Sequence, residues 1–149
     1  MRLESMGVIT SRRMSVTLIN PLDMARPKGF SHGAIGRGRV LAIAGQIGWD
    51  ENSRLVGLDF ISQFGQALAN VARVLFAAGG QPSDLISLRI YVIDKRDYLA
   101  DLSAVGAAYR KQLGRHFPAM ALVEVKGLLE EGARVEIEAL AMLEGEAGT

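Results

Sequence analysis

Two runs of alternating residues near the C-terminus constrain the fold of this chain more than any other feature. They cover residues 119–125 and 133–142, and a short link bounded by glycine joins them. In the second run Val135 and its alternate neighbours share one face, while Glu136 and Glu138 share the other. A period of two is typical of β-strands, and apolar residues on both faces indicate a sheet that is covered on two sides.

Glutamates lie inside these apolar runs, at Glu124, Glu136 and Glu138. A buried carboxylate without a partner is costly, so each should be exposed, paired or functional. They could pair with basic residues such as Arg89 or Lys126. Alternatively, one of them lies in a largely apolar cleft, where a raised pKa would let it orient or deprotonate a water molecule. The sequence leaves both interpretations open.

The size and composition of the chain are typical of one soluble domain. Its 149 residues are enough to bury a core, and they carry a formal net charge of +1. The absence of cysteine excludes disulfides, thiol catalysis and cysteine-ligated metals. The near-zero charge gives no reason to expect a nucleic-acid partner, and no apolar run reaches the roughly 18–20 residues that span a bilayer. We therefore expect a cytoplasmic protein without a membrane or nucleic-acid partner.

The folded domain is expected to cover residues 14–143. Residues 1–13 lack the apolar core of a secretory signal, and Met6 and Met14 offer further possible start codons. We interpret this segment as a flexible leader. The polar residues 144–149 predict a frayed tail.

The first part of the domain predicts short strands. Residues 15–19 alternate, a second strand is expected near residues 34–35, and a third covers residues 40–44. The sequence GRGR at 36–39 predicts a hairpin turn between the second and third strands. A phosphate-binding loop is the alternative for two glycine-separated arginines, but a turn with solvated charges is the favoured interpretation.

The period then changes to that of helices. Residues 59–80 predict an amphipathic helix that begins at an aspartate N-cap and ends at a glycine pair. The run 85–93, rich in β-branched residues, predicts a central strand. A second helix follows, capped by Asp94 or Asp97 and ended by Gly114.

This order of strands and helices predicts one α+β domain. Two helices can cover only one face of a sheet, yet several strands carry apolar residues on both faces. Because the sequence offers no third helix for the other face, we expect a homo-oligomer assembled on the open face of the sheet.

The sequence contains no metal or cofactor motif. His32 and His116 are the only histidines, and their spacing is not that of a metal site. Ser31 directly precedes His32, and adjacent side chains of an extended segment point apart, which argues against a catalytic triad. Neither G-x-G-x-x-G nor a P-loop is present. We therefore expect no metal and no cofactor.

Short segments along the chain match, in order, the motifs of a known family. They are GFSH at 29–32, AGQ at 44–46, QFGQALAN at 63–70, AAGG at 77–80, PAMALVEV at 118–125 and VEIEA at 135–139. Together they resemble the reactive-intermediate deaminase family, also called RidA/YjgF-like or endoribonuclease L-PSP-like proteins. The resemblance covers the chain from about Ile19 to Met142.

The resemblance implies a fold similar to chorismate mutase of the Bacillus type. This is a mixed β-sheet with two helices packed on one face, assembled as a homotrimer with ligand clefts between subunits. The resemblance also implies a reaction, the hydrolysis of short-lived enamines and imines to keto acids and ammonia. In that reaction an arginine anchors the substrate carboxylate as a bidentate partner, and a glutamate with backbone groups handles the attacking water.

The matched positions assign the expected site. Glu136 matches the water-handling glutamate, Gly45 lies in a cleft motif, and Phe30 matches an aromatic residue that is often tyrosine. The family's anchoring arginine follows Pro-Ala, where this chain has Met120. Methionine offers no charge and no hydrogen-bond donor, so loss of the charge-assisted contact should cost about 1.5–3 kcal/mol in binding.

We therefore expect an altered substrate, which is more apolar or anchored differently. Arg89, Arg115 or His116 could supply an anchor from elsewhere. The first hypothesis is an imine, enamine or related hydrolase, and the alternative is a non-catalytic trimer that binds a small molecule as a metabolite sensor or sequestering protein. A ribonuclease, a label that some family members carry, is disfavoured by the near-zero charge and the absence of an aromatic and basic stripe.

Overall fold

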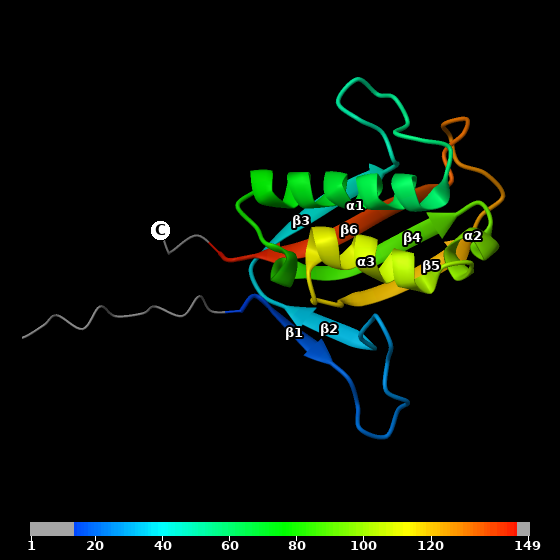
Figure 1. Ribbon diagram of the computed structural model, residues 1–149. Helices are drawn as coiled ribbons and strands as arrows, with labels where there is room; N and C mark the ends of the chain where they lie inside the picture. The colour runs from blue at the N-terminus through cyan, green and yellow to red at the C-terminus, as the bar shows by residue number, and fades with distance from the viewer. Residues whose placement is uncertain (1–13, 146–149) are drawn as a thin grey trace, which may run out of the picture.

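The computed structural model describes residues 14–145 of the chain (Figure 1). The expected leader and most of the expected tail therefore lie outside the described residues. The elements in chain order are β1 (Val16–Ile19), β2 (Gly33–Gly36), β3 (Arg39–Gln46), α1 (Phe60–Ala77), a 3-10 turn (Pro82–Asp84), β4 (Leu85–Val92), α2 (Lys95–Leu99), α3 (Leu102–Leu113), β5 (Ala119–Glu124) and β6 (Val135–Leu143). None of the described helices is long and apolar enough to cross a membrane.

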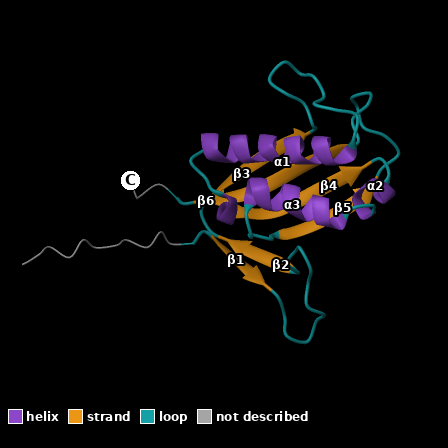
Figure 2. Ribbon diagram, in the orientation of Figure 1, coloured by secondary structure: helices purple, strands orange, loops and turns teal. Residues whose placement is uncertain are grey.

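The main sheet has four strands in the order β3-β6-β4-β5. Strand β6 runs antiparallel to both β3 and β4, whereas β5 runs parallel to β4. A parallel pair needs a crossover connection, and the segment containing α2 and α3 supplies it. Helices α1 and α3 lie on the same face of this sheet (Figure 2). The mixed α+β sheet with its two long helices on one face is confirmed.

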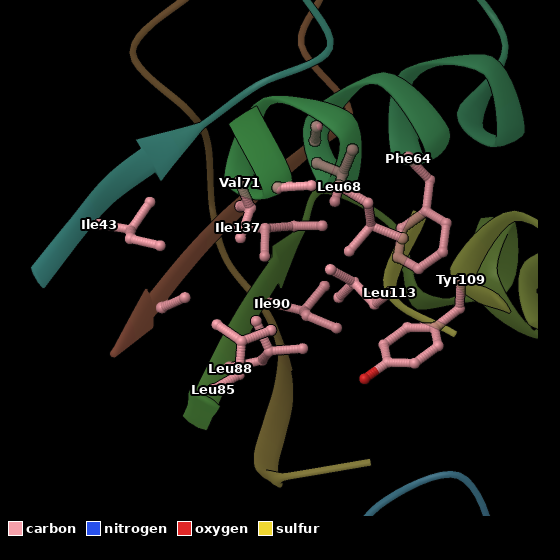
Figure 3. Packing of buried hydrophobic residues seen from close by; sticks show 14 of the residues in the cluster. Ile43, Phe64, Leu68, Val71, Leu85, Leu88, Ile90, Tyr109, Leu113 and Ile137 are labelled. Atoms are coloured by element: carbon pink, nitrogen blue, oxygen red, sulfur yellow. The ribbon is translucent and has the colours of Figure 1, made fainter. Parts of the chain in front are cut away.

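The hydrophobic core fills the space between these helices and the sheet (Figure 3). Phe64 and Leu68 of α1 lie on the same helix face, and both are fully buried. The facing strands contribute alternate residues, including Ile90 of β4 and Ile137 of β6. The apolar stripe of α1 thus packs against every second residue of the strands. The intervening strand residues face the opposite side of the sheet.

The first helix begins and ends as the sequence predicts. The carboxylate of Asp59 accepts a hydrogen bond from the backbone N–H of Ser62 at 3.0 Å. The predicted second helix, however, is wrong as a single element, because it is divided into α2 and α3. Asp94 caps α2, and Asp101 then caps α3 by accepting from the backbone N–H of Ala104 at 3.0 Å. An aspartate that captures the backbone in this way begins a new helix and interrupts the old one.

The predicted hairpin between the second and third strands is also wrong. Strand β2 pairs with β1 in a separate two-stranded sheet, and β3 joins β6 in the main sheet. Gly38 carries the chain from one sheet to the other with a φ of +123°, and a Cβ atom there would overlap the carbonyl group of Leu143. Arg39 donates to the carbonyl oxygen of Glu144 at 3.2 and 3.3 Å. These contacts favour a connecting turn over a phosphate-binding loop.

Candidate active site

Most of the face of the main sheet opposite the helices is uncovered in the single chain, and Gly36 of β2 lies against the Met142 side chain at one end of it. Its apolar strand residues are exposed, with Val40 at 66% and Leu140 at 39% of their full accessible surface. The same face carries further exposed apolar residues, namely Ala42, Ala44, Ala121 and Val123. We call this surface, formed by the outward residues of β3, β6, β4 and β5, the open face.

A polar cluster interrupts the open face where β4 and β6 pair. It consists of Arg89, Tyr91, Glu136 and Glu138, with Tyr91 opposite Glu136 and Arg89 opposite Glu138 in the strand register. The Tyr91 hydroxyl donates to Oε1 of Glu138 at 2.5 Å, and Nη1 of Arg89 lies 3.9 Å from the same oxygen. This hydrogen bond, together with burial, raises the pKa of Tyr91 above its usual value near 10. The paired interpretation therefore applies to Glu138.

Glu136 is the other carboxylate of the cluster, and its environment is different. It is half-buried, and among residues 14–145 its carboxylate has no hydrogen-bond or salt-bridge partner. The register between β3 and β6 shifts after Ile43, and Gly45 lies in the shifted segment. A Cβ atom on Gly45 would overlap the Glu136 carboxylate, so the glycine leaves the space that this side chain occupies.

A small hollow adjoins the polar cluster on the open face. It has a volume of about 120 Å³ and is lined by residues of three strands, among them Ser87, Arg89, Glu138 and Leu140. Its walls combine a guanidinium group, a hydroxyl, a carboxylate and an aliphatic side chain. Such a mixture can hold a small molecule that has both polar and apolar atoms. No group of three His, Asp or Glu side chains converges within residues 14–145 to hold a metal ion.

Phe30 lies at the β5 edge of the sheet, in the loop between β1 and β2. The next residue, Ser31, fixes this loop: its N–H donates to the carbonyl of Pro118 at 3.0 Å and its hydroxyl donates to the carbonyl of Phe117 at 2.7 Å. The ring of His32 meets the ring of Phe30 edge-on, with centroids 5.5 Å apart. Because β5 and β3 are opposite edges of the sheet, Phe30 and Gly45 do not meet within one chain.

Met120 lies on the helix side of β5. It is opposite Leu88 in the register and packs against the hydrophobic core, whereas Glu136 belongs to the open face. Within one chain the structure therefore groups Arg89, Gly45 and Glu136, and it leaves Met120 and Phe30 near the β5 edge.

The remaining candidates are separated from the polar cluster. The Glu124 carboxylate accepts from the backbone N–H of Lys95 at 3.1 Å, which ties the end of β5 to α2. Nε2 of His116 lies 2.8 Å from the carbonyl oxygen of Leu85, so this ring is already engaged. Tyr91 is a member of the polar cluster that the sequence did not reveal, although its two-residue spacing from Arg89 places both on one face of a strand.

The family model described as endoribonuclease L-PSP matches residues 23–143. Among curated relatives, the 2-iminobutanoate/2-iminopropanoate deaminase of Capra hircus is 35% identical over 105 residues, which cover 70% of this chain and 73% of the relative. The protein of the same name from Escherichia coli K12 is 31% identical over 105 residues, which cover 70% of this chain and 80% of the relative.

Solved structures agree with this match. YyfB of Yersinia pestis, described as a protein of unknown function of the conserved Rid family, aligns with a TM-score of 0.79 and 38% identity, covering 87% of this chain and all (100%) of that one. The YjgF gene product of Escherichia coli aligns with a TM-score of 0.59 and 30% identity, covering 76% of this chain and 87% of that one.

Proposed function

The chain belongs to the endoribonuclease L-PSP family of RidA/YjgF-like proteins, and we propose that it hydrolyses an imine or enamine at the open face of its sheet. Relatives that carry the name of an imine deaminase support the class of reaction. The observation that carries the proposal for this chain is the half-buried Glu136 carboxylate, which has no partner among residues 14–145 and sits in the space left by Gly45.

Hydrolysis of an imine needs a group that moves protons between water and nitrogen. Water adds to the imine carbon while one of its protons passes to Glu136, and the nitrogen takes a proton from solvent, to which the later loss of the hydroxyl proton returns one, as the C=N bond becomes a single bond. Glu136 then returns its proton to the amine nitrogen, the C–N bond breaks, and the hydroxyl proton is lost as the carbonyl forms. The sum is imine plus water giving a carbonyl compound plus ammonia, with Glu136 unchanged.

We propose a homotrimer with clefts between subunits as the active form. The exposed apolar residues of the open face support an assembly, because a neighbouring subunit would remove Val40 and Leu140 from water. A second copy could also bring its β5 edge, with Phe30 and Met120, towards the open face that carries Glu136. The small-molecule substrate would then bind between two chains, and we assign the protein to the cytoplasm with no nucleic-acid or membrane partner.

The substrate is proposed to differ from a simple 2-imino acid. Neither Met120 nor Phe30 carries a group that binds a carboxylate. Arg89 is the cation of the open face among the described strand residues, and it borders the hollow beside Glu138. We therefore assign Arg89 as the anchor of any polar substituent on the substrate, while the apolar lining favours a hydrocarbon portion.

The test is ammonia release from imines that are generated in solution from a panel of amino acids. Glu136→Gln should lose turnover by about 100-fold or more, since it removes the proton acceptor. Glu124→Gln is the matched control, because its carboxylate lies at the start of α2 and should leave the rate unchanged. Equal rates for the wild-type protein and Glu136→Gln would overturn the assignment.

Non-catalytic binding is the second candidate, and the methionine at position 120 favours it. A protein without the usual anchor could retain a cleft for a metabolite and lose the chemistry. Saturable binding with a raised melting temperature, in the absence of ammonia release from any imine of the panel, would support this candidate over the hydrolase.

A further inference from the structure

Two carboxylates point to the open face from β6, separated by a single residue. In a β-strand such positions are about 6.6 Å apart along the backbone, so the charges of Glu136 and Glu138 interact. Two equivalent carboxylates can each accept a hydrogen bond from a water molecule or a neighbouring donor, so the strand alone does not select one of them as the base. A hydrolase that uses one of them has to make the two different.

Tyr91 makes them different in this structure. Its position is opposite Glu136, yet its hydroxyl donates diagonally to Oε1 of Glu138 at 2.5 Å. Arg89 adds a positive charge 3.9 Å from the same oxygen. Glu138 therefore has a donor and a cation, while the Glu136 carboxylate has neither within residues 14–145.

The charged and titratable groups around Glu136 are few among the described strands. They are Glu138 on its own strand and Arg89 and Tyr91 on β4. Strand β3 contributes Ala42, Ala44 and Gly45 on this side, and β5 contributes Ala121 and Val123, none of which titrates. A change at Tyr91 or Glu138 therefore acts on Glu136 without interference from a further ionisable strand residue.

We propose that Tyr91 is a positioning residue, whose hydroxyl holds Glu138 in place and leaves Glu136 as the carboxylate that accepts the proton from water. This inference rests on the hydrolase function proposed above. It adds a division of labour between the two glutamates. Glu138 provides a fixed negative charge beside Arg89, and Glu136 accepts the proton from water and later returns it to the nitrogen.

The first test compares the pH dependence of kcat in three variants. In Tyr91→Phe the Glu138 anion loses its donor and is free to approach Glu136, and a closer like charge disfavours an ionised carboxylate. The acid limb of the profile should move up by roughly 0.5–1 pH unit. In Glu138→Gln the neighbouring negative charge is absent, so the acid limb should move down. Tyr98→Phe is the control, since Tyr98 packs against Phe60 on the helix side and its profile should match the wild type.

A second measurement tests the hydrogen bond without any turnover. The protein has three tyrosines, so the Cζ resonances of labelled tyrosine can be assigned from Tyr91→Phe and Tyr98→Phe. The Tyr91 resonance should respond when acid removes the Glu138 anion that accepts its hydrogen bond, and it should lose that response in Glu138→Gln.

The outcomes separate the two proposals. A Tyr91 resonance that does not respond to Glu138, or a Tyr91→Phe profile that matches the wild type in an active enzyme, would overturn the role of Tyr91 alone. Absence of imine hydrolysis by the wild-type protein would overturn the proposed function, and the positioning role of Tyr91 with it, even where the resonance confirms the hydrogen bond. Opposite shifts in Tyr91→Phe and Glu138→Gln are the expected result, because a merely structural defect would move both profiles in the same way.

Discussion

Gly45→Ala should impair activity far more than stability. The added Cβ would lie 2.8 Å from Cδ and 3.0 Å from Cγ of Glu136 and would overlap its carboxylate. Gly45 has no positive φ, so space rather than backbone conformation requires the glycine. Because the colliding atoms belong to the far part of a flexible side chain, Glu136 can rotate away, and the free energy of unfolding should fall by only about 1–2 kcal/mol. A displaced proton acceptor, in contrast, should lower kcat by about 100-fold.

Two controls isolate the collision between Gly45 and Glu136. A Cβ on Gly127, in the loop before β6, would meet no atom within 4 Å, so Gly127→Ala should keep both stability and activity. The double variant Gly45→Ala with Glu136→Ala should be no less stable than Glu136→Ala alone, because the clashing side chain is gone. Urea unfolding gives the stabilities, and ammonia release gives the rates.

Two results would refute this reasoning. A loss of stability in Gly45→Ala that persists in the Glu136→Ala background would mean that the backbone of β3, and not Glu136, limits the space. Full activity of Gly45→Ala, with Glu136→Gln inactive, would mean that the carboxylate does not act from its position beside Gly45.

Three further perturbations have defined outcomes. Gln63→Leu should lower the free energy of unfolding, measured in urea, by about 3–5 kcal/mol. The fully buried amide of Gln63 makes hydrogen bonds to three backbone groups, and leucine would leave all three unsatisfied. Gln63→Glu should recover only the hydrogen bond that the side chain accepts from the backbone N–H of Arg134. The hydrogen bond from the Arg96 side chain lowers the pKa of Asp94 from 3.8 to about 2, so the Asp94 carboxylate contributes stability at pH values above its unfolded pKa. The melting temperature of the wild type should therefore fall more steeply between about pH 4 and pH 2 than that of Asp94→Asn. If the protein assembles on the open face as proposed, Leu140→Lys should convert the oligomer to monomers in light scattering, whereas Leu129→Lys, in a fully exposed loop position, should not. A Leu140→Lys variant that keeps an oligomeric wild-type mass would count against assembly on this face.

The sequence predicted those parts of the fold that are determined by residues close together in the chain. The Asp59 cap, the helical stripe of α1 and the alternation of β4 and β6 are all set within a few residues of each other. The pairing of β1 with β2 was missed because both strands have only four residues, so their partners are decided by long-range contacts such as the bond from Ser31 to Pro118. The break before Asp101 was missed because Asp94 and Asp97 precede it and offer equally good caps.

The site was predictable only as far as motifs mark it. Gly45 and Glu136 were selected as candidates through segments that match the family. Their proximity in the structure follows from the pairing of β3 with β6, which the sequence does not specify. Tyr91 was missed because an aromatic residue in a β-branched run is typical of a core strand. Its hydroxyl gains a hydrogen-bond partner only once the register sets it beside two glutamates, and that register is a property of the folded sheet.

The position of Met120 connects the altered substrate with the proposed assembly. Strand alternation alone groups Met120 with Leu122, and the structure adds that this group packs under the helices, on the side opposite Glu136. A residue at position 120 can therefore reach a substrate at Glu136 only around the β5 edge, and the edge of a second chain is the one that can approach an open face. In the proposed assembly, a methionine at position 120 would leave out a contact that an arginine could make to the substrate, while the proposed proton acceptor of each chain would stay in place. We therefore expect the chemistry to persist and the choice of substrate to change.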